Sequence, residues 1–244
     1  MNPTGNTILI TGGGSGIGRG LAEALHALGN QVVIAGRRKQ ALDETTAANP
    51  GMKSLQLDIE DPAAIRAFAA QLTASFPKLN VLINNAGIMR AEKLLAQQDD
   101  LTDAEAMVTT NLLGPIRLTA ALLPHLGQQA SATILNVSSG LAFVPLAYTP
   151  TYCATKAAIH SYTQSLRYQL KDTAIEVLEL IPPYVQTDLM AGAEDPRAMP
   201  LAKFLAEVME ILQTQPTPPE ICVQNVNGLR LAAENGHTRQ SSAA

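Results

Sequence analysis

Three side chains in one stretch of the sequence could together move a proton. Tyr152 and Lys156 lie four positions apart, so on a helix they share one face and the ammonium lies near the phenol. A positive charge there favours the phenolate and lowers the phenol pKa from its usual value of about 10. Ser139 follows the apolar run 133–137, which predicts a hydroxyl at the carboxyl end of a strand. These residues form a candidate acid–base site; an exposed tyrosine beside a lysine is the alternative.

A proline suggests a fourth member of this site. The pattern from 102 to 129 predicts a long helix, and Pro115 lies inside it. Because proline has no N–H, the carbonyl of Asn111 loses its helical partner. We expect this carbonyl to hold a water next to Lys156, which makes Asn111 part of a proton relay. A simple helix kink is the alternative.

The elements that must position these residues alternate between strand and helix. The helix that carries Tyr152 is expected to begin at Pro150, with Thr149 as its cap. Strands are expected at 7–10, 31–35, 53–57, 81–83, 133–137, 175–181 and 221–226, with helical segments between them and at 201–212 and 228–234. The alternation predicts an α/β fold, a Rossmann-type doubly wound parallel sheet of about seven strands with helices on both faces. We expect one domain over residues 1–236 and a disordered tail over 237–244.

A glycine-rich loop joins the first strand to the first helix. It contains Gly12 and the run Ser15-Gly16-Ile17-Gly18. Glycines allow the main chain to approach a pyrophosphate, whose charge is stabilised by the N-terminus of the following helix. We therefore predict that Gly12 and residues 15–18 bind a dinucleotide. The alternative is a flexible turn that binds nothing.

The end of the second strand bears on which dinucleotide is bound. An acidic residue there would bind the ribose 2′-hydroxyl of NAD. Gly36 stands in its place, and Arg37 and Arg38 follow with guanidinium groups that can pair with a 2′-phosphate. The sequence therefore favours NADP(H) over NAD(H). Two solvated arginines at a strand end are the alternative.

Composition excludes several other classes of protein. Net charge is -4, and the longest basic cluster is Arg37-Arg38-Lys39, so no nucleic-acid partner is expected. Two cysteines and four histidines show no disulfide or metal-ligand spacing. We see no signal peptide and no apolar run of membrane-spanning length, and we expect a cytoplasmic protein without a bound metal. Charged residues make up only 16% of the chain, which suggests that another subunit covers part of the surface.

In combination, these motifs resemble the short-chain dehydrogenase/reductase family across nearly the whole chain. The family's order is matched by the glycine loop, by Asn84-Asn85-Ala86-Gly87, and by Asn111, Ser139, Tyr152 and Lys156. The departures are Pro183, where a glycine is common, and Ser15, where many NADP-preferring members have a basic residue. The stretch Pro-Pro-x-Val-x-Thr and the C-terminal third resemble a bacterial subgroup named for DltE.

The resemblance implies roles for individual residues. Tyr152 is the general acid or base, Lys156 lowers its pKa and holds the nicotinamide ribose, Ser139 orients the carbonyl, and Asn111 anchors a relay water. Asp58 would meet the adenine, and Asn85, Val185 and Thr187 would line the cofactor path. The family also implies a homodimer or a homotetramer.

The expected activity is NADP(H)-dependent hydride transfer between nicotinamide and a ketone or secondary alcohol. The segment 143–149 and the loop 188–200 are rich in apolar residues, which favours a hydrophobic substrate. Ordinary core packing of the loop's methionines is the alternative for that part. Two further alternatives for the whole protein are a non-catalytic dinucleotide-binding regulatory protein and an NAD-dependent alcohol dehydrogenase.

Overall fold

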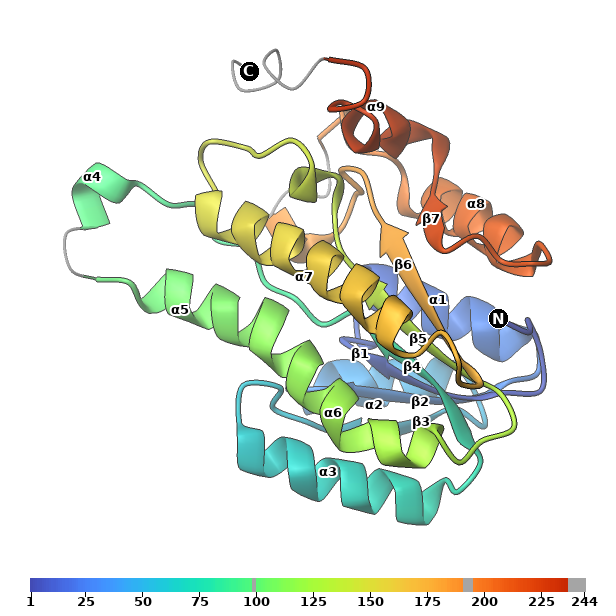
Figure 1. Cartoon of the computed structure of the whole chain (residues 1–244). Coiled ribbons are helices and arrows are strands. Elements are labelled where there is room, and N and C mark those ends of the chain that lie inside the picture. Colours follow the sequence, from blue (N-terminus) through green and yellow to red (C-terminus); the bar gives the residue numbers. More distant parts are fainter. Residues whose placement is uncertain (98–99, 191–194, 237–244) are drawn as a thin grey trace.

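Apolar runs separated by amphipathic helices produce one parallel sheet between two helical layers (Figure 1). The computed structural model describes residues 1–97, 100–190 and 195–236. In these residues seven strands pair in the order β3-β2-β1-β4-β5-β6-β7. Their bounds are β1 Thr7–Thr11, β2 Gln31–Gly36, β3 Lys53–Gln56, β4 Leu79–Asn84, β5 Ala132–Val137, β6 Ile175–Ile181 and β7 Glu220–Cys222. The predicted α/β class and doubly wound parallel sheet are confirmed.

Each face of the sheet has its own hydrophobic core. One core joins the sheet to α1 (Gly16–Ala27), α2 (Lys39–Ala48) and α8 (Leu201–Gln213). The other joins it to α3 (Pro62–Ser75), α6 (Gly114–Leu126) and α7 (Pro150–Gln169), which lie in front of the sheet in Figure 1. Because helices cover both faces, all six residues of β5 are buried, as expected for a central parallel strand.

Short elements complete the described chain. They are α4 (Leu94–Gln97), α5 (Thr102–Val108), a π-helical turn (Thr109–Leu113), α9 (Asn227–Arg230) and the 3-10 turns Gly140–Ala142, Asp188–Met190 and Gln224–Val226. Figure 1 shows α4 projecting away from the sheet. The predicted disordered tail, 237–244, lies outside the described residues.

The last strand is shorter than predicted. Its partners on β6 are only Glu179 to Ile181, and after them the chain continues as Pro182-Pro183. Proline has no N–H for the ladder, so β6 cannot extend and β7 ends at Cys222. The expectation of a strand from 221 to 226 was therefore wrong for residues 223–226.

The segment 102–126 is one continuous helical run with a π-helical turn at its middle. By length and composition alone it could cross a membrane, which corrects the expectation that no apolar run has that length. In the structure Leu118 and Leu122 of this run are buried in the core beside α3 and the sheet. Its apolar face therefore packs against the sheet and α3.

The strand order reverses between β1 and β4. From β1 the chain proceeds through β2 and β3 on one side, and β4 lies on the other side of β1. The loops that leave the carboxyl ends of β1 and β4 therefore diverge, and in open α/β sheets this point is where ligands bind.

Candidate active site

A cavity of about 850 Å³ opens at this point. It extends from the glycine loop after β1 to the N-terminal half of α7. The predicted residues that line it are Gly12, Ser15, Gly16, Ile17, Gly18, Arg37, Arg38, Asn85, Ser139, Tyr152, Lys156, Val185 and Thr187. Two predicted residues, Asp58 and Asn111, are not among the lining residues.

The glycine loop has the shape that a pyrophosphate needs. Gly12 and Gly16 have φ of +69° and +53°, and a Cβ on Gly18 would lie 2.3 Å from Asn85 Nδ2. The N-terminus of α1 has neither a side-chain cap nor an acidic residue in its first turn. Its free N–H groups and positive dipole end therefore face the cavity and suit a negatively charged group.

Asn85 fixes the second wall of this loop. Its Nδ2 donates to the Thr11 carbonyl at 2.9 Å, while the Thr11 hydroxyl accepts from the N–H groups of Asn85 and Ala86 at 3.0 Å. The end of β4 is thereby fastened to the end of β1. Through these bonds Asn85 shapes the cavity wall.

The two arginines at the end of β2 have different environments. Arg37 pairs with Glu60 at 2.8 Å, and Glu60 also accepts from the Thr110 hydroxyl. Arg38 donates to Ser15 Oγ at 2.8 Å, which places its guanidinium on the glycine loop. Both arginines line the cavity, but only Arg38 lies against the predicted phosphate-binding loop.

The remaining predicted cofactor residues divide into two groups. Asp58 is exposed, and its carboxylate accepts from the Glu60 N–H at 3.0 Å. Its neighbours Leu57 and Ile59 line the cavity instead. Val185 and Thr187 are in the lining, and Thr187 lies beside Gly16, where a Cβ would meet it at 3.4 Å.

Tyr152 and Lys156 share one face of α7, as their spacing predicts. Both are about 5% exposed. The Lys156 Nζ lies 5.6 Å from the centroid of the Tyr152 ring and donates to the Val137 carbonyl at 2.9 Å. α7 begins at Pro150, as expected.

The electrostatics of this pair differ from the prediction in one respect. Burial raises the pKa of Tyr152 to about 12, opposed by a hydrogen bond with Ser139. Burial also lowers the pKa of Lys156 to about 8, opposed by the charge of Glu179. The expectation of a lowered phenol pKa is therefore wrong for the protein alone, because burial, the largest influence on this group, acts in the opposite direction.

Ser139 lies at the carboxyl end of β5, as predicted. Its hydroxyl accepts from the Leu141 N–H at 3.1 Å and forms the hydrogen bond with Tyr152. The neighbouring Ser138 hydroxyl is buried and has no partner in the described part of the chain. Two hydroxyls, of Ser139 and Tyr152, thus meet at the cavity wall, where they could hold one carbonyl oxygen.

Asn111 lies behind the wall, within the π-helical turn that precedes Pro115. Its side-chain amide donates to the Ile88 carbonyl at 2.8 Å and accepts from the Ile88 N–H at 2.8 Å. Gly87 lies between Asn111 and Lys156, since a Cβ there would be 3.4 Å from Asn111 Oδ1 and 3.7 Å from Lys156 Nζ. The structure therefore brings Asn111 near the lysine, and its role as water anchor stays a prediction.

A buried acid that sequence reasoning missed holds the start of α7. Glu92 is 6% exposed and accepts from both the N–H and the hydroxyl of Thr151 at 2.8 Å. The predicted cap, Thr149, donates to the Arg90 carbonyl instead. The first turn of α7 is thus capped by Glu92, from the loop after β4. In the sequence, the acidic residue itself was the signal that could have pointed to this contact.

Apolar and polar side chains line the cavity near Tyr152. Leu146 of the predicted segment 143–149 is among them, together with Leu141 and Tyr184. Phe143 packs against the imidazole of His160, and Val144 is buried. Arg90, Tyr148 and the ion pair of Asp195 with Arg197 at 2.8 Å also line the cavity, and only Arg90 lies outside the predicted segments 143–149 and 188–200.

The predicted loop 188–200 is only partly part of this site. Leu189 lines the cavity, whereas Met199 is 2% exposed within the core below α8. The packing alternative therefore holds for Met199. Residues 191–194 lie outside the described residues.

Comparisons with known proteins identify the family of the chain. The family model described as short chain dehydrogenase matches residues 6–198. "Uncharacterized oxidoreductase DltE" of Bacillus subtilis is 39% identical over 242 residues, covering 98% of this chain and 96% of that protein.

Two solved structures are similar in fold. A short chain dehydrogenase from Burkholderia cenocepacia in complex with NADP has a TM-score of 0.83 at 25% identity, covering 99% of this chain and 100% of that one. A 3-ketoacyl-(acyl-carrier-protein) reductase from Brucella melitensis complexed with NADH has a TM-score of 0.80 at 26% identity, with coverages of 91% and 97%. The chain belongs to the short-chain dehydrogenase family, whose members are oxidoreductases that use a nicotinamide dinucleotide.

Proposed function

We propose that this protein transfers hydride between NADP(H) and a hydrophobic ketone or secondary alcohol. The observation that carries the proposal is that the Tyr152 and Ser139 hydroxyls meet at the wall of a cavity whose far end holds Arg38. A reacting carbonyl and a 2′-phosphate would thus occupy opposite ends of one cavity.

Each residue has a defined part in this reaction. The glycine loop and the α1 N-terminus hold the pyrophosphate, and Arg38 with Ser15 binds the 2′-phosphate. Ser139 donates to the carbonyl oxygen, and Tyr152 gives it a proton as the alcohol forms. Lys156, when protonated, stabilises the negative charge left on the phenol oxygen. The cofactor, when bound, supplies the hydride.

Two features support the substrate class and the setting. Leu141 and Leu146 line the cavity beside Tyr152, which suits an apolar carbonyl compound. We also propose that the protein acts in the cytoplasm. A homodimer or homotetramer is proposed because only 16% of its residues are charged, which suits a surface partly covered by another subunit.

The test is loss of reduced-cofactor absorbance with NADPH and NADH in parallel, against aliphatic, aryl and cyclic ketones. We expect turnover with NADPH that exceeds turnover with NADH. Tyr152→Phe should abolish turnover while NADPH still binds, because only the proton donor is removed. Tight NADPH binding without turnover of any carbonyl would support a regulatory protein instead, and a preference for NADH with alcohol oxidation would support an NAD-dependent dehydrogenase.

A further inference from the structure

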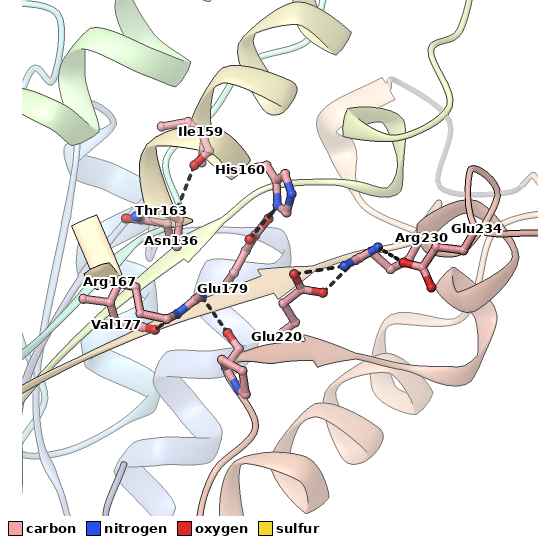
Figure 2. A network of polar contacts seen from close by, with 11 residues as sticks. Asn136, Ile159, His160, Thr163, Arg167, Val177, Glu179, Glu220, Arg230 and Glu234 are labelled. Carbon is pink, nitrogen blue, oxygen red and sulfur yellow. Dashed lines mark hydrogen bonds and ion pairs between the residues drawn. The ribbon is translucent and has the colours of Figure 1, made fainter. Parts of the chain in front are cut away.

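Figure 2 shows a network of polar contacts that includes the buried Glu179 and the exposed Glu234. Glu179 of β6 is fully buried, and both its carboxylate oxygens contact Nδ1 of His160 at 2.9 and 3.0 Å. Because an ionised carboxylate can only accept, the imidazole nitrogen is the donor. A buried carboxylate is costly to keep charged, so a donor at this position is needed.

His160 continues the line of proposed active-site residues along α7. Tyr152, Lys156 and His160 are spaced by four residues and so lie on one helical face. Lys156 donates to the carbonyl of Val137, and the residue before Val137 is paired with Glu179 in the sheet. The ammonium therefore contacts β5 at Val137, one position along from the residue that pairs with Glu179 of β6.

Other charges near Glu179 are already engaged. Arg167 lies about two turns after His160 on α7. It donates to the carbonyls of Val177 and Pro219. Glu220 is the neighbour of Glu179 in the sheet, and it is paired with Arg230, which also pairs with Glu234 (Figure 2).

The same cluster contains donor atoms of His160, Glu179 and Glu220 within 4.8 Å of one another, a spacing that could suit a metal ion. A metal ion here would lie next to the positive charge of Arg230, which is paired with Glu220. It would also have to displace the proton that His160 Nδ1 donates to Glu179. The internal ion pairs account for the cluster without one.

The charge of Glu179 affects the pKa values of two neighbouring groups, Lys156 and Cys222. Its charge opposes the lowering of the Lys156 pKa, for which burial is the largest cause. It also contributes to raising the pKa of the Cys222 thiol to about 11, after burial and Glu220. A buried carboxylate acts strongly over such distances because the surrounding dielectric constant is low.

We propose that Glu179, held by His160, is a positioning residue that keeps the Lys156 side chain in its ammonium form. The inference rests on the proposed acid–base role of Tyr152 and Lys156 and adds the group that maintains it. Without Glu179, Lys156 would lose its proton at a lower pH, and the stabilising charge beside Tyr152 would be lost with it.

A direct titration tests the inference without turnover. Protein carrying ¹³C at the lysine ε carbon is titrated by NMR without cofactor, and the Lys156 signal is identified by its loss in Lys156→Arg. In Glu179→Gln, which keeps the shape of the side chain, we expect the Lys156 midpoint to fall by about one pH unit. Glu234→Gln removes an exposed carboxylate from the far end of the same network and should leave the midpoint unchanged.

A second pair of variants serves if Glu179→Gln does not fold. His160→Ala leaves the buried carboxylate without its donor, which favours its neutral form, so the midpoint should fall as well. His160→Asn can donate from the same place and should restore most of the wild-type value. Equal midpoints in the wild type and in Glu179→Gln, or in His160→Ala, overturn the inference.

Activity measurements separate this inference from the proposed function. With an active ketone, the basic limb of the kcat/KM profile should move to lower pH in Glu179→Gln by the same shift as the NMR midpoint. If no carbonyl is reduced by any variant, the proposed function fails while the NMR titration still decides the role of Glu179. If turnover occurs and the midpoint does not move, only the inference fails.

Discussion

Glu92 and Thr151 join the loop after β4 to the first turn of α7 through two hydrogen bonds of 2.8 Å. The residue after Thr151 is Tyr152. The position of the proposed proton donor therefore depends on a buried carboxylate 60 residues earlier in the chain.

Glu92→Ala should lower both stability and turnover. Loss of a charged cap at a buried helix start costs about 1 to 2 kcal/mol of unfolding free energy. Denaturant unfolding measures the first effect, and kcat at saturating NADPH measures the second. Glu105→Ala removes an exposed carboxylate on α5 and is the matched control. Equal unfolding curves for the two variants would show that Glu92 does not support the helix.

Arg38→Ala should weaken NADPH binding more than Arg37→Ala does. Arg38 already lies on Ser15 of the glycine loop, whereas Arg37 is engaged by Glu60. Loss of a charged hydrogen bond to phosphate corresponds to a rise in Kd of about tenfold or more. Fluorescence titration with NADPH measures this rise, and NADH is the control ligand. An equal loss for both cofactors would assign Arg38 to a part of the dinucleotide that they share.

The pKa of Lys156 predicts how stability changes in alkali. The folded-state value, about 8, lies below the ordinary value of 10.5, so between these values the unfolded chain binds more protons. Stability from this group therefore rises with pH across that window, by at most about 1.4 kcal/mol per pH unit. The measurement is the unfolding free energy of the wild type minus that of Lys156→Met from pH 7 to 10. Parallel curves for the two proteins would contradict the prediction.

Asn136 is expected to be a major contributor to stability. It is fully buried, accepts from Asn84 Nδ2 at 2.8 Å and donates to the Thr163 hydroxyl at 2.9 Å, which links β4, β5 and α7. Asn136→Ala removes both of these bonds, while Asn84 keeps its bond to Thr119 and Thr163 keeps its bond to Ile159, so it should cost about 1 to 3 kcal/mol. Thr163→Val removes one of these bonds at nearly constant volume and should cost less. Chemical denaturation of both variants provides the comparison.

The fold was predictable because its signals are local. Apolar runs of strand length and intervening helical periodicity identify the parallel sheet, and the spacing of Tyr152 and Lys156 requires only one helix. The end of β7 was not predictable in this way, because it depends on where the neighbouring β6 reaches Pro182.

The electrostatics of the site could not be read from spacing. Burial is the largest influence on the pKa values of both Tyr152 and Lys156, and burial depends on how the whole chain folds around them. A partial signal was present in Glu179, a carboxylate in an otherwise largely apolar strand. Its partner His160 could not be identified from the sequence, because the contact joins α7 to β6, which only the folded chain brings together.

The isolated bridge between Val185 and Met199 has a consequence for how such a protein can diverge. Tyr184 and Gln186 exchange main-chain hydrogen bonds with Met199 at 2.8 and 2.9 Å, so both ends of the intervening segment are anchored to the core. Changes between these anchors can alter what enters the cavity while the sheet and α7 stay as they are. We therefore expect substitutions in this segment to change which substrates enter without altering the site around Tyr152 and Lys156.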